Sequence, residues 1–469
     1  MTALPIAFQS DPGRYNFEGS AQLLNAYAEK RGADAKAPLS VLPADGIVDL
    51  GTAESPGPCR GLIYLEDLDA AYAVHPSNVY KITHAAGVFT ATRIGNIPGN
   101  DTVQLSRNQN AAPQIVVRSD AGVQIIQSDA VAFIADEDLP DDAVTADFVG
   151  GYHAYGFEDR TFYLSGLNSA GEVDGADFAT FEQKAGKLIR IVEHSGNLYG
   201  LCSRWSEVWR NTGNADFPFE PIATLSRGIK SADGVTICDN ALFAVTDDGL
   251  ICRLDNTNWQ RVSTHHVERL IQADAAAEDI FGFSWTRDGH AFANFTGSTW
   301  TRCYDAATGV WHSRESYGYD RWRARHSIRA WGKTIVGDRF GGKLGYLARD
   351  TFTEYGEPMV WGVDSPTLHV FPNGGICDAL HLDIATGYGL LSGQGSNPQV
   401  MLQVSTDGGN TFGQYRELEL GVTGRYATRV TARRLGRFGP KGMVFRLRIS
   451  DPVVRALIGA AVDVRPLRK

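Results

Sequence analysis

The stretch His75-Pro76-Ser77-Asn78-Val79-Tyr80-Lys81-Ile82 places a polar turn directly before a short run of residues that favour a β-strand. The same arrangement returns six more times, at intervals of about 38 to 51 residues. The further turns lie at 119–122, 158–160, 203–206, 247–249, 297–299 and 341–342, and the strands after them at 123–126, 161–164, 207–210, 250–254, 300–304 and 343–347. This spacing is typical of four-stranded blades, which can close into a ring without a long free sheet edge. The repeat predicts an all-β chain with a β-propeller of about seven blades; a two-sheet all-β protein is the alternative.

The repeat divides the chain into three parts. Residues 1–58 lack the blade pattern and are predicted to form an N-terminal arm, and residues 59–360 are predicted to form the propeller. In residues 361–469 the strands become longer, which indicates a C-terminal β domain or an elaborated closing blade. A short helix is predicted at 264–271, with Ser263 as its candidate N-cap, and serves only as a connector.

Composition favours an ordered chain: of 469 residues, 43% are hydrophobic, and 51 glycines suit many tight turns. No run approaches the roughly 20 apolar residues of a membrane helix. The start Met1-Thr2-Ala3-Leu4-Pro5 lacks the features of a signal peptide. The six cysteines are scattered, without the spacings typical of metal sites. We therefore expect a protein without a membrane span, made in a reducing cytoplasm, whose cysteines are core thiols.

Charge is distributed unevenly along the chain. Residues 1–300 contain 21 Lys and Arg against 39 Asp and Glu, a balance of −18, whereas residues 301–469 contain 23 against 15, a balance of +8; together they give the net charge of −10. The basic part includes Arg425, Arg429, Arg433 and Arg434. Arginines spaced along strands form protein assembly surfaces more often than nucleic-acid sites. These four are therefore predicted to contact a protein partner, with DNA as the alternative.

Segments that could suggest catalysis or a cofactor are better explained as turns. Gly337-Asp338-Arg339-Phe340-Gly341-Gly342-Lys343-Leu344 has the spacing of a phosphate-binding loop, but Leu344 replaces the Ser or Thr and no helix follows. The glycines around Gly387 lack the βαβ unit of a dinucleotide site. His265 and His266 diverge by about 100° on a helix, so one helix face cannot present both to a metal. No G-x-S-x-G or H-E-x-x-H motif occurs, and the sequence predicts no enzyme activity, cofactor or metal.

The run Asp136-Glu137-Asp138-Leu139-Pro140-Asp141-Asp142 concentrates carboxylates but lacks the glycine that lets a calcium loop fold around its ion. It is predicted to be a solvated acidic loop. Because a negative field repels DNA phosphates, Asp136, Glu137 and Asp138 are candidates for the lining of a DNA channel.

The segment Ser405-Thr406-Asp407-Gly408-Gly409-Asn410-Thr411-Phe412 resembles the Asp-box of sialidases and other β-proteins, with Phe412 in place of Trp. In those families the box staples a hairpin away from the active site: the Asp accepts turn amides, the Gly permits a positive φ, and the ring packs beneath. Ser405, Asp407, Gly409 and Phe412 are therefore predicted to be structural.

Several ordered segments together resemble the packaged-DNA stabilisation protein of short-tailed, podovirus-type phages, also called the tail hub or nozzle. They include Asn25-x-Tyr27-x-Glu29, Gly57-Pro58-x-Arg60-Gly61, Asp177-Phe178-Ala179, Leu198-Tyr199-Gly200, Ser206-Glu207-Val208-Trp209, Arg261-Val262-Ser263-Thr264, Val404-Ser405-x-Asp407-Gly408-Gly409 and Ser450-Asp451-Pro452-Val453. The resemblance covers most of the chain.

This resemblance implies a structural virion protein, not an enzyme. It implies a ring, expected to be a hexamer of this chain, that lies in the virion tail below the portal and its adaptor ring. There it would close the channel, retain packaged DNA without sequence-specific binding, and mount the tail needle and the tailspike or fibre proteins.

Two other functions remain open from the residues alone. The Asp-box and nine tryptophans are compatible with a carbohydrate-active or carbohydrate-binding propeller. A host propeller that binds peptides would have the same general features.

Overall fold

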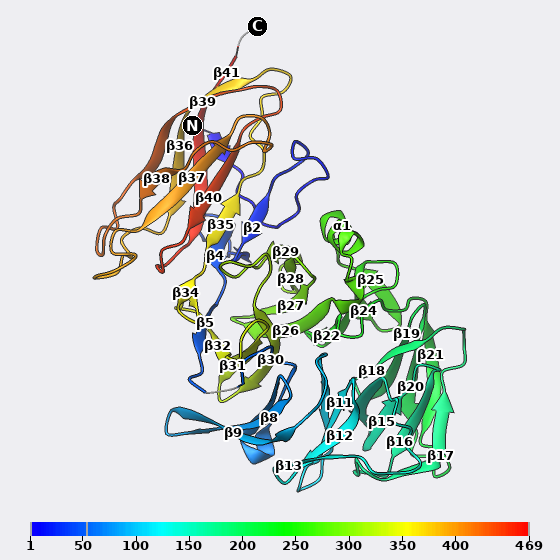
Figure 1. Cartoon of the computed structure of the whole chain (residues 1–469). Coiled ribbons are helices and arrows are strands. Elements are labelled where there is room, and N and C mark those ends of the chain that lie inside the picture. The colour runs from blue at the N-terminus through cyan, green and yellow to red at the C-terminus, as the bar shows by residue number, and fades with distance from the viewer. Residues whose placement is uncertain (1, 53–54, 468–469) are drawn as a thin grey trace.

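The computed structural model describes residues 2–52 and 55–467 and is built almost wholly of β-strands. Figure 1 shows two bodies: a ring of small sheets, and a second β domain that carries both labelled chain ends. The prediction of a β-propeller followed by a C-terminal β domain is therefore confirmed.

The ring consists of seven blades in the described residues, each an antiparallel sheet of four strands. The first three blades are β6 (Gly61–Leu65), β7 (Ala70–His75), β8 (Asn78–Ala85) and β9 (Val88–Asn96); β10 (Gln104–Arg107), β11 (Ile115–Ser119), β12 (Gly122–Gln127) and β13 (Ala130–Phe133); and β14 (Thr145–Val149), β15 (Tyr152–Gly156), β16 (Thr161–Ser165) and β17 (Val173–Thr180). The next three are β18 (Leu188–His194), β19 (Asn197–Cys202), β20 (Ser206–Asn211) and β21 (Phe219–Leu225); β22 (Val235–Cys238), β23 (Ala241–Val245), β24 (Ile251–Asp255) and β25 (Asn258–Arg261); and β26 (Phe281–Arg287), β27 (His290–Thr296), β28 (Thr301–Asp305) and β29 (Val310–Ser313).

The repeat seen in the sequence is the third strand of each blade. Its seven copies fall on β8, β12, β16, β20, β24, β28 and, in blade seven, β32 (Leu344–Ala348). The turn before each copy closes the hairpin between the second and third strands, where Gly122 and Gly249 adopt φ values of +104° and +77°. One hairpin per blade explains the period.

Blade seven closes the ring with a strand from the other end of the propeller sequence. Its inner strands are β30 (Ala324–Ala330), β31 (Lys333–Asp338) and β32, and its outer strand is β5 (Gly46–Asp49), in which Val48 pairs with Tyr346. The small hairpin of β33 (Thr353–Glu354) and β34 (Glu357–Pro358) follows. Leu50 and Ala71 pack with Ile335 and Leu344 in one buried cluster, so blades one and seven share a core.

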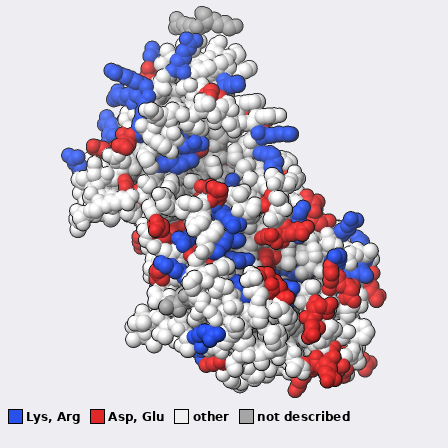
Figure 2. All heavy atoms as spheres, in the orientation of Figure 1, with Lys and Arg blue, Asp and Glu red and all other residues white. Residues whose placement is uncertain are grey.

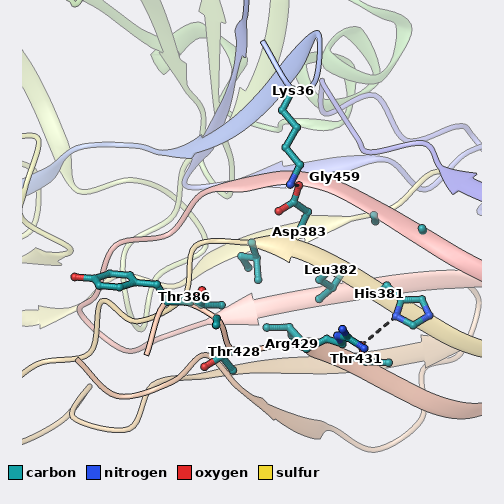
Figure 3. Close-up of a pocket in the computed structure, with 15 residues that line it drawn as sticks. Lys36, His381, Leu382, Asp383, Thr386, Thr428, Arg429, Thr431 and Gly459 are labelled. Carbon is teal, nitrogen blue, oxygen red and sulfur yellow. Dashed lines mark hydrogen bonds and ion pairs between the residues drawn. The ribbon is translucent and has the colours of Figure 1, made fainter. Parts of the chain in front are cut away.

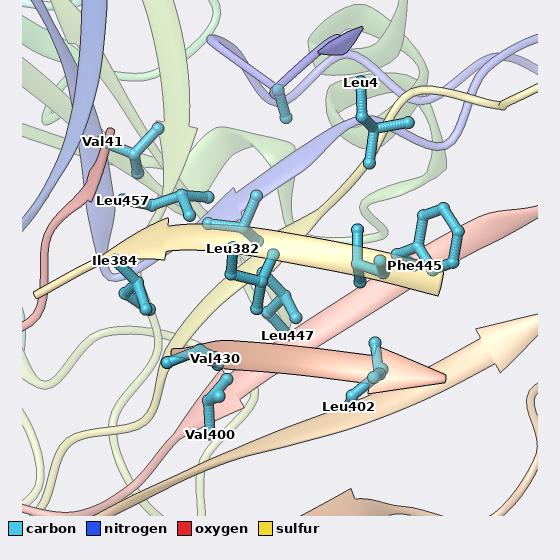
Figure 4. Packing of buried hydrophobic residues seen from close by; sticks show 14 of the residues in the cluster. Leu4, Val41, Leu382, Ile384, Val400, Leu402, Val430, Phe445, Leu447 and Leu457 are labelled. Carbon is cyan, nitrogen blue, oxygen red and sulfur yellow. The ribbon is translucent and has the colours of Figure 1, made fainter. Parts of the chain in front are cut away.

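The second domain is a sandwich of two sheets. One sheet has the order β3 (Ala26–Lys30), β4 (Leu39–Pro43), β41 (Leu457–Pro466), β36 (Gly375–Ile384) and β39 (Val430–Phe438), and β1 (Thr2–Leu4) also pairs with β41. The other has the order β35 (Trp361–Asp364), β40 (Val444–Ile449), β37 (Gln399–Ser405) and β38 (Arg416–Glu419). Alternate residues of these strands face inward, as a period of two requires. Figure 4 shows Leu382, Val400, Leu402, Phe445 and Leu447 meeting between the sheets.

Residues 1–58, expected to be a separate arm, are instead divided between the two domains. Strand β2 (Gln22–Leu24) pairs with β29 of blade six on one side and with β35 of the sandwich on the other. Blade six and one sandwich sheet thereby form a continuous sheet of nine strands. These pairings join residues about 290 and 340 positions apart, which a local sequence pattern does not reveal.

The predicted connector helix is α1 (His265–Ala273), and short 3₁₀ turns occupy Glu66–Leu68 and Ala277–Asp279. Thr264, not Ser263, is the N-cap of α1, and its side chain makes no capping bond. The Ser263 hydroxyl instead donates to Glu268 Oε1 at 2.8 Å. Val267 and Ile271 pack into the core of blades five and six, so the helix covers these blades. All six cysteines are buried and form no disulfide.

Candidate functional site

Five exposed arginines follow one edge of the sandwich: Arg425, Arg429, Arg433, Arg434 and Arg437, which we call the arginine edge. The last three lie on β39, the terminal strand of its sheet, and the first two lie on the loop that leads into it. Val430, Ala432, Leu435 and Phe438 of the same strand are buried. The hydrophobic side chains of β39 thus point into the core, and its arginines point into solvent.

The arginine edge differs from the other sandwich arginines in its pairing. Arg446 and Arg448 bind the buried Asp364 at 3.0 and 2.6 Å, and Arg465 binds Asp378 at 2.6 Å. Within the described ranges, none of the five edge arginines forms an ion pair. Their guanidinium groups remain available to a carboxylate or phosphate of another molecule.

A β-bulge distorts β39 in the middle of the arginine edge. The register against β36 shifts between Cys377 and Ala379, and Arg434 and Gly436 have φ values of +56° and +100°. Arg416 Nη1 of the other sheet donates to the carbonyl oxygens of Arg433 and Arg434 at 3.1 and 3.3 Å. A bulge with charged side chains hinders addition of a further strand, so the edge suits side-chain recognition better than β-augmentation.

A groove of about 550 Å³ lies beside the arginine edge, on the outer face of the same sheet (Figure 3). Arg429 and Thr431 line it together with His381, and Lys36 pairs with Asp383 across it. Gly459 and the two alanines after it carry no side chains large enough to fill the space.

Within the groove, His381 contacts Thr431 Oγ1 at 3.1 Å and Asp463 Oδ2 at 3.3 Å. The order of hydroxyl, imidazole and carboxylate resembles a catalytic triad. These residues are, however, neighbours on adjacent strands of one solvent-facing sheet, where polar side chains commonly satisfy each other. The hydrogen bond from His381 favours the charged form of Asp463 and so lowers the pKa of this carboxyl group. The groove thus offers an arginine-flanked recess, with both polar and apolar walls, for part of a partner.

The Asp-box residues form the turn between β37 and β38. Asp407 Oδ1 accepts the backbone N–H groups of Asn410 and Thr411, both at 3.0 Å, and the Ser405 hydroxyl at 2.7 Å. These bonds lower the pKa of Asp407 to about 2. Gly409 has a φ of +93° and donates to Ser405 Oγ at 2.8 Å.

The Phe412 ring packs against the guanidinium group of Arg446. Arg446, which is paired with Asp364, lies 3.7 Å from the ring centroid. The box therefore joins the β37–β38 turn to the partly buried ion pair of Arg446 and Asp364, on β40 and β35.

The acidic candidates Asp136, Glu137 and Asp138 lie on the loop from β13 to β14, between blades two and three. Asp136 accepts the N–H of Asp138 at 3.0 Å and that of Val173, in blade three, at 3.0 Å. Glu137 and Asp138 are exposed. One carboxylate thus fixes the loop while the others face solvent; their position relative to a DNA channel stays a prediction.

The other segments that resemble catalytic motifs form turns and internal contacts of the fold. Gly337–Leu344 forms the hairpin between β31 and β32, in which Asp338 binds Arg323 at 2.6 Å. His265 contacts Glu268 at 3.3 Å, whereas His266 contacts Arg302 at 3.1 Å. No cluster of three His, Cys, Asp or Glu suited to a metal occurs in the part of the chain that the structure describes. No helix of that part is long and apolar enough to cross a membrane.

Two family models cover nearly the whole chain. Residues 34–352 match the β-propeller of bacteriophage P22 Gp10, and residues 360–465 match the β-sandwich of the same protein. The chain belongs to the P22 Gp10 family of phage stabilisation proteins. The match of both domains, in order, agrees with the resemblance to packaged-DNA stabilisation proteins. The family is one of phage structural proteins, which gives no support to a carbohydrate-active function.

Other comparisons concern the fold only. The propeller is similar to the WD40 β-propeller domain of Doa1, with a TM-score of 0.40 and 10% identity over 63% of this chain and 94% of that one. It is also similar to the computationally designed Ika8 protein, with a TM-score of 0.41 and 10% identity over 65% of this chain and 99% of that one. A search among curated proteins found no match. The family assignment therefore rests on the two domain matches.

The groove was not predicted from the sequence, because its lining comes from strands far apart in the chain. Arg437 is not among the four arginines predicted from the sequence, although it lies on the same strand as Arg433 and Arg434. A strand register fixed on the buried Val430, Ala432 and Leu435 would have grouped it with them.

Proposed function

We propose that this protein forms a ring in the phage tail that closes the portal channel, retains the packaged DNA and mounts further tail parts. The arginine edge is the observation that carries the proposal. Five exposed cationic groups that form no ion pair within the described residues are costly to gather along one sheet edge and its loop unless another molecule neutralises them. Membership of a family of phage stabilisation proteins supports an assembly role for such a surface.

The charge distribution supports association between copies. Figure 2 shows Lys and Arg over much of the sandwich, and Asp and Glu gathered on the propeller. Opposite fields on the two domains favour contact between the sandwich of one copy and the propeller of the next, and they suppress sandwich-to-sandwich pairing. We propose a ring of six copies built in this way.

The continuous sheet through β2 supports a role in which the protein withstands mechanical force. Asn25, directly after β2, donates to the carbonyl oxygens of Glu315 and Val360 at 2.9 and 2.8 Å and accepts from Glu315 N at 3.1 Å. Arg455, fully buried, donates to Met359 and Phe352 at 2.6 and 3.3 Å. The junction between the domains is thus held by main-chain and buried polar contacts, which suits a part that resists internal DNA pressure.

The partners of the ring are part of the proposal. The portal adaptor ring, the tail needle and the tailspike or fibre proteins would dock on it, and the DNA in the channel would be contacted without sequence readout. The exposed acidic groups around Glu137 would keep such a channel from adhering to DNA phosphates.

The test replaces two edge arginines with the opposite charge. The double variant Arg433→Glu and Arg434→Glu should fold normally, because both side chains are exposed and unpaired, but should fail to form rings and should leave filled heads that lose their DNA. Light scattering of the purified protein and the DNA content of purified particles are the readouts.

The matched control is the double variant Arg204→Glu and Arg329→Glu on the propeller. Both residues are exposed and unpaired within the described residues, so the charge change is identical. Ring formation and DNA retention at the wild-type level in the Arg433 and Arg434 variant would refute the proposal.

A further inference from the structure

A cavity of about 260 Å³ lies on the axis of the propeller, where the inner strands of six blades converge. Its walls include Thr102 and Gln104 of blade two, Arg190 of blade four, Asp233 before blade five, and Phe281 of blade six. The lining is mainly polar. Neither the arginine edge nor the groove of the sandwich is part of this site.

Three arginines from blades four and seven lie at this cavity or beside residues that line it. Arg190 lines it directly and donates to Ala232 O at 2.7 Å. Arg325 donates to the hydroxyl of Thr102, and its guanidinium carbon lies 5.0 Å from the centre of the Phe281 ring. The guanidinium carbon of Arg339 lies 5.8 Å from the same ring. Phe281 therefore holds two of the three cations beside the cavity.

These arginines keep buried donors that the protein does not use. Among the described residues, Nε of Arg190, Nε of Arg325, and both Nε and Nη2 of Arg339 are buried without a hydrogen-bond partner. A buried, unsatisfied N–H group costs free energy, and buried donors are almost always paired in folded proteins. Four such donors belong to arginines at or beside this cavity, and an acceptor from outside the chain would satisfy them.

The carboxylates nearby do not balance these cations. Asp233 lies 3.5 Å from Arg190. Asp101 and Asp120 are engaged by the buried Arg60, at 3.3 and 3.6 Å, and Asp101 also by Arg118.

The remaining carboxylate, Asp338, is engaged by Arg323 at 2.6 Å. Burial, with the neighbouring Arg325 and Arg321, lowers the pKa of Arg339 to about 9, as expected in a positive field.

A distorted residue marks the same place. His326, which lines the cavity, has a φ of +57° at a bulge in β30, and its ring lies 4.7 Å from Phe281. Backbone strain of this kind costs free energy and is concentrated at binding sites.

We propose that the axial cavity binds one compact oxyanion, a carboxylate or phosphate group, through Arg190, Arg325 and Arg339. Three guanidinium groups from two blades match the several oxygens of such an anion, and the cavity has room for a small anion but not for a nucleic-acid strand. The anion would tie blades four and seven together across the axis. The site is independent of the proposed role in the tail.

The test uses the full-length protein with inorganic phosphate, with succinate, and with chloride at equal ionic strength. Phosphate or succinate should raise the melting temperature above that in chloride, and calorimetry should detect a single site; the better of the two identifies the oxyanion as phosphate or carboxylate. In Arg190→Gln the affinity should fall about tenfold or more, because a charge-assisted donor is lost.

Arg329→Gln is the matched control, because Arg329 is an exposed arginine on the same strand as Arg325. It should bind like the wild type. Arg190 is only partly buried, so its variant should fold even if Arg339→Gln does not.

A crystal grown in selenate should in addition show anomalous density beside Phe281. Equal melting temperatures in all three salts, or the same affinity for Arg190→Gln and the wild type, would overturn the proposal.

Discussion

Arg60 and Asn25, which belong to the segments that carry the family resemblance, join parts of the fold through buried hydrogen bonds. Arg60, fully buried, donates to the carbonyl oxygens of Pro76, Ile97 and Asp101 at 2.7, 3.0 and 2.6 Å, and so holds blade one to blade two. Asn25 has a φ of +48° and uses its amide to join the N-terminal segment, blade six and the interdomain linker. Asn tolerates this conformation better than other residues with a side chain, and no hydrophobic residue could make the bonds.

Asn25→Ala is predicted to lower the free energy of unfolding by about 2–4 kcal/mol, because two buried carbonyl oxygens and one N–H lose their partner. Chemical denaturation measures the change. Asn25→Gly relieves the backbone but not the bonds, and should remain destabilised; a wild-type stability for both variants would contradict the role of the side chain.

Asp407 is predicted to make the stability of the sandwich depend on pH. Its pKa of about 2 in the folded protein lies below the value of about 3.9 for an unstructured Asp. A lowered pKa gives stability that is complete above pH about 4 and is lost as the pH falls toward 2.

Asp407→Ala should therefore destabilise the sandwich at pH 6 by about 1–2 kcal/mol, and by clearly less at pH 3. Thr406→Ala, an exposed change in the same turn, is the control. An equal loss for Asp407→Ala at both pH values would show that the charge of Asp407 is not responsible.

Among the elements, two short strands decide how the chain is joined. Strand β2 links blade six to the sandwich, and β5 completes blade seven. Both come from a part of the chain with no repeat of its own. Because the propeller closes through β5, loosening this strand should weaken blades one and seven together.

Ile47→Ala tests the closure by β5. Ile47 is 1% exposed and packs with Val336 and Trp322, so its truncation should cost about 2–4 kcal/mol. Hydrogen exchange should become faster in β5, β32 and β26, whose residues pack in the cluster of Ile47, before other blades respond. Val48→Ala, on the more exposed face of the same strand, should have a smaller effect; uniform acceleration in all blades would contradict the closure.

The repeated hairpin turns of the blades could be predicted from the sequence, whereas the pairings between strands far apart in the chain could not. Each turn before a third strand, such as that at Gly249, is encoded within about ten residues, so the propeller and its blade number could be predicted. The placement of Gly46–Asp49 could not, because its partner strand lies about 300 residues away. The same limit hid the axial cavity, because the six blades that line it come together only when the ring has closed.

At the scale of the whole molecule, the structure combines a rigid ring, a sandwich joined to it by a shared sheet, and opposite charges on the two. The groups that make internal ion pairs, such as Arg446 and Arg448, are separate from the unpaired arginine edge. This division between internal and available cations supports an assembly protein whose contacts lie on the sandwich.

Electron cryo-microscopy of purified virions tests this account most directly. We predict a ring of six copies below the portal, with Arg433 and Arg434 of each copy in contact with a neighbouring chain. A tail without this protein, or a ring in which the arginine edge faces open solvent, would contradict it.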